Sequence, residues 1–357
     1  MKLGIIGFPN SGKKTLFRLL TKSELHEAKL AEMKPLPGTA FIRDIRFDSL
    51  VDMYGPKKAS PAAISLELIP DFDRKTAGNA ATFRTIAQYD AICLAVRAFE
   101  DDAVYHVNGS VNAERDADEI HAEFIMHDLI FADTRIRKIE EAEKKGKGGH
   151  AAAEKELMMK FKEHLEKGLP LRVFPLAEKD SRIISGYPLI TLKKEVLAVN
   201  CGENCLGDGA ELEKWEKRLS GQDVEIMLIS AKVEGEIDAL DSEDEKREFM
   251  NALGIREPVI NRLSFLCMKT LGLISFFTVG KDEVRQWLVR EGATAPAAGG
   301  VIHSDIERGF IRAELMKYED LVIFESEQKL KNAGKYHVMG RDYVFEDGDI
   351  ASFRFNV

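Results

Sequence analysis

The most constraining feature of the sequence is the segment 7–13, which reads GFPNSGK. It stands between residues 2–6, a short apolar run typical of a buried strand, and residues 13–21, whose leucines have helical spacing. Glycines let a backbone wrap closely around a phosphate group with its N–H groups pointing inward, and the lysine reaches the outer phosphate oxygens. The sequence therefore predicts a P-loop between the first strand and the first helix.

The expected phosphate-binding residues are those of this loop and the first helical turn: Gly7, Asn10, Ser11, Gly12, Lys13, Lys14 and Thr15. A P-loop lysine is ordinarily followed by a Ser or Thr whose hydroxyl ligates Mg²⁺. That position is Lys14 here, and Thr15 stands one place too late. The ammonium group of Lys14 could neutralise phosphate charge in place of the ion. The sequence thus assigns no metal ligand and no catalytic residue, and it gives little support for bound Mg²⁺.

Four more apolar runs have the length of central strands: residues 64–69, 91–96, 195–200 and 225–230. Helical stretches separate them, which predicts an α/β domain with a mainly parallel sheet covered on both faces. With 357 residues, of which 45% are hydrophobic, the chain is long enough for two or three domains.

A charged, Gly-poor region lies between the strands predicted at 91–96 and 195–200. Its apolar residues recur at alternating four- and three-residue steps, as in a coiled coil: Ile125, Leu129, Ala132, Ile136 and Ile139. Glycines at 146, 148 and 149 break this helix, and residues 151–167 resume it, which predicts an inserted antiparallel helical hairpin. The hairpin is either a structural spacer or a partner-binding arm. Lys144, Lys145 and Lys147 at its tip either contact RNA phosphate or form a solvated loop.

Beyond about residue 275 the pattern changes to short strand-like pieces with Gly-rich connections, at 273–279, 288–290, 342–345 and 351–355. This predicts a separate small α+β domain. The expected division is a nucleotide-binding domain at 1–112 and 181–274, a helical insert at 113–180, and a C-terminal domain at 275–357.

The formal net charge of −9 excludes a globally basic nucleic-acid binder and leaves room only for local RNA contact. The four cysteines lack the spacing of a zinc site and are expected as reduced thiols. Cys201 and Cys205 could chelate or cross-link, although two small loop residues are the favoured interpretation. The N-terminus has no signal-peptide pattern and no run approaches a membrane span, so we expect a cytoplasmic protein without a membrane partner.

Two later loops follow predicted strands, at the positions where GTPase-like proteins have the loops that bind the purine base. Residues 200–203 (NCGE) stand where an Asn-Lys-x-Asp motif would read guanine, but a Glu is longer than an Asp and makes guanine selectivity doubtful. The next strand ends in a segment suited to packing on a base. The expected base-binding residues are Asn200, Glu203, Ser230, Ala231 and Lys232. The Asp-x-x-Gly tetrapeptide of GTPase-like proteins follows none of the predicted strands.

Together with residues 99–102 (FEDD) and 300–314 (GVIHSDIERGFIRAE), these motifs resemble those of YchF, the Obg-like ATPases, and the likeness continues to residues 353–357 (FRFNV). The resemblance implies a Ras-like nucleotide-binding domain, a helical insert and a C-terminal TGS domain. It also implies binding of ATP, or another purine nucleotide, with ATP preferred to GTP through the Asn-x-x-Glu motif. Ribosomes or translation factors are the partners that it implies.

The departures from this family fall in one place. Besides Lys14, the family's Asp-Ile-Ala-Gly falls on residues 68–71 (LIPD), its first switch falls near residues 32–37 (EMKPLP) without the threonine, and the water-orienting position is Phe72. All these groups would face the metal or the terminal phosphate. Loss of metal ligands should raise the barrier to hydrolysis by several kcal/mol, about a thousandfold or more in rate.

The resulting hypothesis is a regulator, at the ribosome or in translation or stress response, that binds adenine nucleotide through Lys13 and hydrolyses it weakly or not at all. One alternative is a non-catalytic adaptor that acts through the hairpin and the TGS-like domain. Another is an active ATPase of the YchF type, if Thr15 or Asp71 recruits a metal ion in an unusual geometry.

Overall fold

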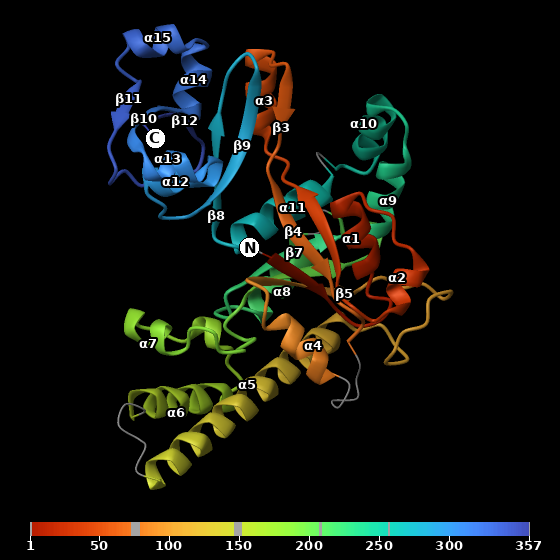
Figure 1. Ribbon diagram of the computed structural model, residues 1–357. Coiled ribbons are helices and arrows are strands. Elements are labelled where there is room, and N and C mark those ends of the chain that lie inside the picture. Colours follow the sequence, from red (N-terminus) through yellow and green to blue (C-terminus); the bar gives the residue numbers. More distant parts are fainter. Residues whose placement is uncertain (1, 73–78, 146–151, 207–208, 256–257, 357) are drawn as a thin grey trace. The chain divides into compact units, whose positions relative to one another are not determined.

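The computed structural model describes residues 2–356 except 73–78, 146–151, 207–208 and 256–257. The chain divides into two compact units. The first contains Met1–Gly38 and Ser65–Ile260, and the second contains Thr39–Ile64 and Asn261–Val357. Each unit contains one six-stranded sheet, although residues 39–41 and 63–64, at the ends of two strands of the first sheet, cluster with the second unit (Figure 1).

The sheet of the first unit has the strand order β2-β4-β1-β5-β6-β7. β1 pairs in parallel with β4 and β5, and the parallel pairing continues through β6 and β7. The strands are β1 (Lys2–Ile6), β2 (Leu36–Phe41), β4 (Ala63–Leu68), β5 (Ala91–Arg97), β6 (Lys194–Asn200) and β7 (Val224–Ile229). The mainly parallel α/β fold and its five expected strands are confirmed. β2 was not expected, because it contains Pro37 and Gly38, which are both rare in strands.

Helices cover the first sheet on both faces. One of its cores joins β1, β5 and β6 to α5 and α8, where Phe124 and Trp215 are buried. The helices are α1 (Lys13–Thr21), α2 (Glu27–Ala31), α4 (Asn79–Ile86), α5 (Ala113–Lys144), α6 (Ala152–Glu166), α7 (Glu178–Ile183), α8 (Gly209–Arg218), α9 (Ala231–Ala239) and α10 (Glu243–Ala252). The described part of the unit also contains the 3-10 turns η2 (Leu171–Val173) and η3 (Glu203–Cys205).

The predicted helical hairpin is confirmed as α5 and α6, which lie side by side (Figure 1). Ile125, Leu129 and Ile136 of α5 pack against a core that includes Met158 and Phe161 of α6. Asn112 caps α5 by accepting a hydrogen bond from the backbone N–H of Arg115 at 2.9 Å. The predicted break at Gly146, Gly148 and Gly149, and Lys147 beside it, fall outside the described residues.

The second unit has a mixed sheet with the order β11-β10-β12-β8-β9-β3. Its strands are β3 (Lys58–Ser60), β8 (Leu273–Thr278), β9 (Glu283–Arg290), β10 (Phe310–Lys317), β11 (His337–Met339) and β12 (Asp349–Phe355). Its helices are α3 (Ile45–Tyr54), α12 (Ala295–Ile302), α13 (Ser304–Arg308), α14 (Tyr318–Phe324) and α15 (Glu327–Asn332), while α11 (Val259–Thr270) leads into it. The adjacent Phe276 and Phe277 of β8 belong to separate cores, because successive strand residues face opposite sides of a sheet.

Two features of the second unit differ from expectation. Residues 39–64 cluster with this unit, although they were expected in the nucleotide-binding domain, because β3 pairs in parallel with β9 and α3 adds Phe47 and Leu50 to the core of Phe277. The predicted strand 342–345 is wrong, since Val344 forms only an isolated bridge to Thr294.

Candidate phosphate-binding site

The loop between β1 and α1 has the tight geometry that its glycines permit. Asn10 and Gly12 adopt positive φ angles of 62° and 91°. A Cβ atom on Gly12 would lie 2.0 Å from Asn200 Nδ2, and one on Gly7 would lie 2.4 Å from the carbonyl oxygen of Ala95. A larger side chain at Gly12 would displace the Asn200 side chain, and one at Gly7 would displace the backbone of Ala95.

The same loop presents groups suited to an anion. Gly12 is the N-cap of α1 and supplies no side-chain cap, so the first turn keeps backbone N–H groups available. Ser11 Oγ is buried and has no hydrogen-bond partner within the described part of the chain. The side chain of Lys13 is 2% exposed at the start of the helix. Orphaned donors beside a buried ammonium group fit a phosphate well.

Lys13 is held by the turn that follows β4. Its Nζ donates a hydrogen bond to the carbonyl oxygen of Ile69 at 2.9 Å and lies 3.0 Å from Asp71 Oδ1. Burial lowers the pKa of Lys13 to about 8, and the carboxylate of Asp71 only partly offsets this effect. The ammonium group of Lys14 is half exposed and lies 3.6 Å from the other oxygen of Asp71. Thr15 is half-buried in the next position of α1.

Backbone contacts fix this turn beside the loop. The N–H of Ile69 donates to the carbonyl oxygen of Ile5 at 3.0 Å, and the N–H of Phe72 donates to that of Gly7 at 3.2 Å. The Phe72 ring is 2% exposed and makes edge contacts with Phe8, among other rings of the core. Phe72 was expected at a water-orienting position, but the structure places its side chain in the core.

Asn200 joins the loops that were expected to bind a base to the P-loop. Its Nδ2 donates to the carbonyl oxygen of Ser11 at 3.0 Å, and its Oδ1 accepts from the N–H of Ala231 at 3.0 Å. Ser230 caps α9 by accepting from the N–H of Val233. Glu203 and Lys232 are exposed. The structure therefore brings the P-loop, Asn200 and the start of α9 together.

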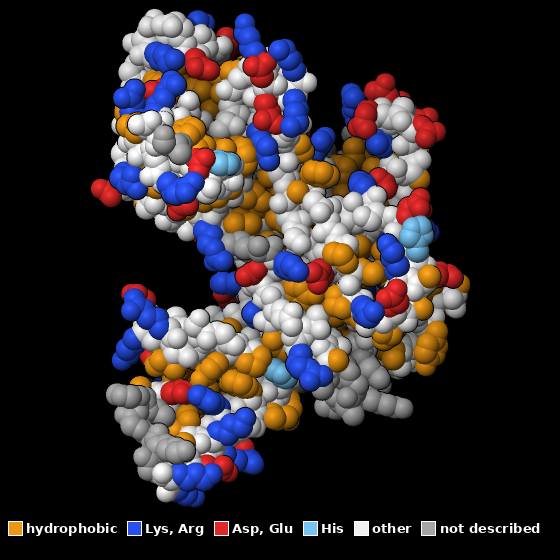
Figure 2. Space-filling model, viewed as in Figure 1, with side chains coloured by type: hydrophobic (Ala, Val, Ile, Leu, Met, Phe, Trp, Pro, Cys, Tyr) orange, Lys and Arg blue, Asp and Glu red, His pale blue; other side chains and the backbone are white. Residues whose placement is uncertain are grey.

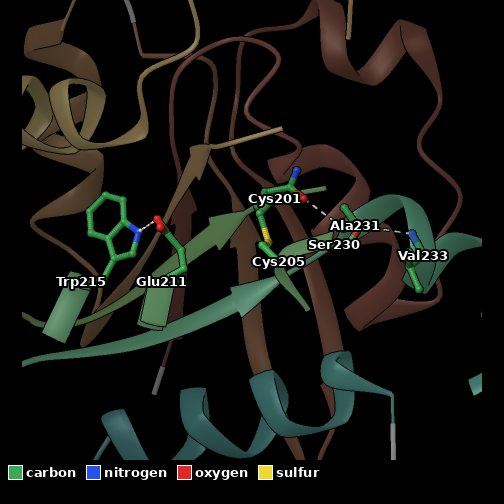
Figure 3. The surroundings of a disulfide bond; sticks show 8 residues. Cys201, Cys205, Glu211, Trp215, Ser230, Ala231 and Val233 are labelled. Atoms are coloured by element: carbon green, nitrogen blue, oxygen red, sulfur yellow. Dashed lines mark hydrogen bonds between the residues drawn. A yellow bond between two sulfur atoms is a disulfide. The ribbon is translucent and has the colours of Figure 1, made fainter. Parts of the chain in front are cut away.

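A disulfide bond closes the loop after β6 (Figure 3). Cys201 and Cys205 are joined, with their Cα atoms 6.2 Å apart. The expectation of reduced thiols is wrong for this pair, because the turn η3 folds the chain back over a four-residue separation and brings both sulfur atoms together. Cys93 and Cys267 are buried thiols. The disulfide encloses Glu203, one of the expected base-binding residues.

Two features of the site were missed in the sequence. Asp71 was considered only as a departure from a motif and a possible metal ligand, and its pairing with Lys13 depends on a turn that no local pattern predicts. Arg97 is buried at the end of β5 and donates to the carbonyl oxygens of Phe99 and Val104 at 3.1 and 2.9 Å. It thereby orders the loop whose Tyr105 carbonyl accepts from Asn10 Nδ2 at 3.0 Å. An arginine at a strand end was the available signal.

Among the residues that the structure describes, no group of three or more His, Cys, Asp or Glu side chains is placed to hold a metal ion. None of the described helices combines the length and the apolar character needed to cross a bilayer. On the helical hairpin, Lys and Arg side chains are interspersed with Asp and Glu (Figure 2).

A parallel sheet with a glycine-rich loop between its first strand and first helix, tied by Asn200 to the loops after β6 and β7, defines a P-loop protein of the Ras-like type. The relatives of the chain specify the group further. The chain belongs to the YchF family of Obg-like ATPases.

The family model "YchF-GTPase_C", described as a protein of unknown function (DUF933), matches residues 273–356. The "Ribosome-binding ATPase YchF" of Bacillus subtilis is 36% identical, and the alignment covers 99% of both chains. "Obg-like ATPase 1" of Caenorhabditis elegans is 33% identical over 100% of this chain and 92% of its own length. The solved structure of the Schizosaccharomyces pombe YchF GTPase has a TM-score of 0.81 at 31% identity, covering 99% of this chain and 97% of the other.

Proposed function

We propose that the chain binds an adenine nucleotide at the P-loop, hydrolyses ATP weakly or not at all, and acts as a nucleotide-dependent regulator at the ribosome. The observation that carries the proposal is the cradle of Gly7, Ser11, Gly12 and Lys13, in which the buried Ser11 hydroxyl has no partner among the described residues and the buried Lys13 ammonium group already binds an anionic carboxylate. Such a cradle binds phosphate through backbone N–H groups and a lysine.

Preference for adenine rests on the loop after β6. Asn200 fixes that loop to the P-loop, so Glu203, three residues later, belongs to the surroundings of a bound base. A Glu cannot take the position from which the shorter Asp accepts the ring and amino N–H groups of guanine. Ser230 and Ala231, at the start of α9, complete the base-binding group together with the exposed Lys232.

Weak hydrolysis is inferred from the residues at the positions that would ligate Mg²⁺ and orient the attacking water. Lys14 replaces the hydroxyl that would ligate Mg²⁺, and it is paired with Asp71. Phe72 lies in the core and cannot orient water. Phosphoryl transfer depends on positioned charge, much of it from the metal ion, so the loss of these groups should slow hydrolysis about a thousandfold or more.

The ribosomal role is inferred from the relatives. The bacterial proteins that match over the full chain are named ribosome-binding ATPases. Cosedimentation with ribosomes, with and without adenine nucleotide, tests this part of the proposal. A chain that stays in the supernatant under both conditions would exclude it.

Titration of fluorescently labelled adenine nucleotides in Mg²⁺ and in EDTA tests the site itself. We expect similar affinities in both buffers and loss of binding in Lys13→Ala. Lys29→Ala, which removes an exposed lysine of α2, is the matched control and should bind normally. Phosphate release at ordinary ATPase rates would refute weak hydrolysis. Equal binding by Lys13→Ala and the native chain would refute the site.

A further inference from the structure

The carboxylate of Asp71 is paired with the two lysine ammonium groups, those of Lys13 and Lys14, that a terminal phosphate would contact. Asp71 Oδ1 lies 3.0 Å from Lys13 Nζ, and Oδ2 lies 3.6 Å from Lys14 Nζ. In a P-loop the lysine ordinarily serves the β and γ oxygens of the nucleotide. Here its ammonium group is already shared between a carboxylate and the carbonyl oxygen of Ile69.

The backbone holds Asp71 in this position from both sides. Ile69 is hydrogen-bonded to β1 and Phe72 to Gly7, at 3.0 and 3.2 Å. Pro70 fixes its own φ angle, and Phe72 is buried among aromatic rings. The backbone of Asp71 is therefore held beside the P-loop, because its displacement would break two hydrogen bonds or expose the Phe72 ring.

The free space beside the carboxylate is a small cavity that is partly open to solvent. It has a volume of about 30 Å³ and lies between the turn and the segment that follows α1, with Lys14, Met33, Lys34 and Asp71 in its lining. The side chain of Asp71 is 30% exposed. A phosphoryl group that entered this cavity would therefore contact the carboxylate of Asp71.

The negative charge of Asp71 also disfavours a terminal phosphate. A triphosphate places one more negative group beside Asp71 than a diphosphate does, and like charges at such separations repel strongly in a partly buried site. A metal ion would normally offset this charge, but Lys14 replaces the hydroxyl that ligates it, and Lys14 is itself paired with Asp71. The P-loop amides and Ser11 Oγ remain available to an inner phosphate.

We propose that Asp71 is a specificity-determining residue that excludes the terminal phosphate, so that the site takes a purine nucleoside diphosphate in preference to the triphosphate. This inference rests on the proposed nucleotide-binding function and adds the phosphorylation state of the ligand. Asp71 acts by contact with the cations of the loop and has no role in chemistry.

The test compares the affinities of ADP and ATP, in EDTA, for the full-length chain and for variants. We expect the native chain to bind ADP at least about tenfold more tightly than ATP. Asp71→Asn removes the charge at constant shape, and Asp71→Gly removes the side chain. Both variants should raise the affinity for ATP about tenfold or more and change the affinity for ADP less than about threefold. Asp244→Asn, which removes an exposed carboxylate that pairs with Arg247, is the matched control and should leave the ratio unchanged.

Each failure has its own signature. A native chain that binds ATP as tightly as ADP overturns the role of Asp71, as does an ADP-to-ATP ratio that both variants leave unchanged, while the nucleotide site itself stands if Lys13→Ala abolishes binding. A native chain that binds neither nucleotide overturns the proposed function as well. The ratio of ADP affinity to ATP affinity in the native chain is decisive even if a variant does not fold.

Discussion

Lys13 is the residue on which phosphate binding depends, and its lowered pKa means that it loses its positive charge at a lower pH than an ordinary lysine. A lysine that is 2% exposed keeps its proton less readily than one in water, and Asp71 compensates only in part. The ammonium form is the one that attracts phosphate. The protonation state of one buried side chain therefore sets the range of pH in which the site can work.

Nucleotide affinity should fall as pH rises through about 8, the pKa of Lys13 in the folded protein. Above that pH the free protein carries neutral Lys13, so binding must take up a proton, and the dissociation constant should increase by up to about tenfold per pH unit. Isothermal titration between pH 6.5 and pH 9.5 measures this slope. Lys13→Arg keeps its charge throughout, and an equal slope in that variant would assign the effect to another group.

The conformation of Gly12 makes a second prediction at this scale. Gly12→Ala combines a φ of 91° with a contact of 2.0 Å to Asn200, so it should destabilise the fold by roughly 2 to 4 kcal/mol. Gly202→Ala is the matched control, because nothing lies within 4 Å of that position and its φ is −72°. Urea unfolding measures both variants. Similar stabilities of the two would contradict the close approach of Gly12 to Asn200.

At the scale of elements, β6 connects distant parts of the first unit. At its start, Glu195 is buried and contacts His121 of α5 at 2.6 Å and Arg172 of η2 at 3.1 Å. At its end, Asn200 reaches the P-loop. Burial alone would raise the pKa of Glu195, but His121 and Arg172 outweigh that effect and lower it to about 2. One strand thus carries a buried ionic contact at one end and the loop contacts at the other.

Acid should weaken the protein through Glu195. Its folded pKa of about 2 lies below the ordinary 4.5, so the unfolded chain takes up its proton first as pH falls. The stabilisation is complete above pH 4.5, and about 2 kcal/mol of it should be lost by pH 3. Glu195→Gln should cost roughly 3 to 5 kcal/mol at pH 7 and less at pH 3. Exposed Glu203→Gln should show neither effect in urea unfolding at the two pH values.

The disulfide of the η3 loop can be tested by counting free thiol groups. We expect two thiols, Cys93 and Cys267, to react in denaturant before reduction, and four to react after it. Ellman titration of the purified chain measures both numbers. Four thiols before reduction would show that Cys201 and Cys205 are reduced in solution, as the sequence had suggested.

The local elements were predictable because their patterns are local. The P-loop, the five apolar strands and the two hairpin helices each show their periodicity within a few residues. β3 was not predictable, since Lys58 and Ser60 become a strand only by pairing with β9, more than 200 residues later. The pairing of Asp71 with Lys13 was equally hidden, because it depends on a turn that two long-range backbone hydrogen bonds hold in place.

At the scale of the whole molecule, residues 39–64 belong to the second unit. Phe47 and Leu50 of α3 are buried in the core that contains Phe277 and Val284. A chain ending at residue 272 would lose β8 and β9, and with them the partner of β3 and the cover of α3. We expect hydrogen exchange at β3 to become unprotected in that truncation while β5 stays protected. Unchanged protection of β3 would contradict its assignment to the second unit.

The division of the chain has a topological consequence. The chain passes from one unit to the other three times, after Gly38, after Ile64 and after Ile260. A single protease cut at any of these points leaves the two units covalently joined, so release requires three cuts. The same holds for recombination between genes: one crossover near residue 260 exchanges most of the second unit but leaves α3 and β3 with a foreign partner. Exchange of the complete second unit would therefore require crossovers at all three points.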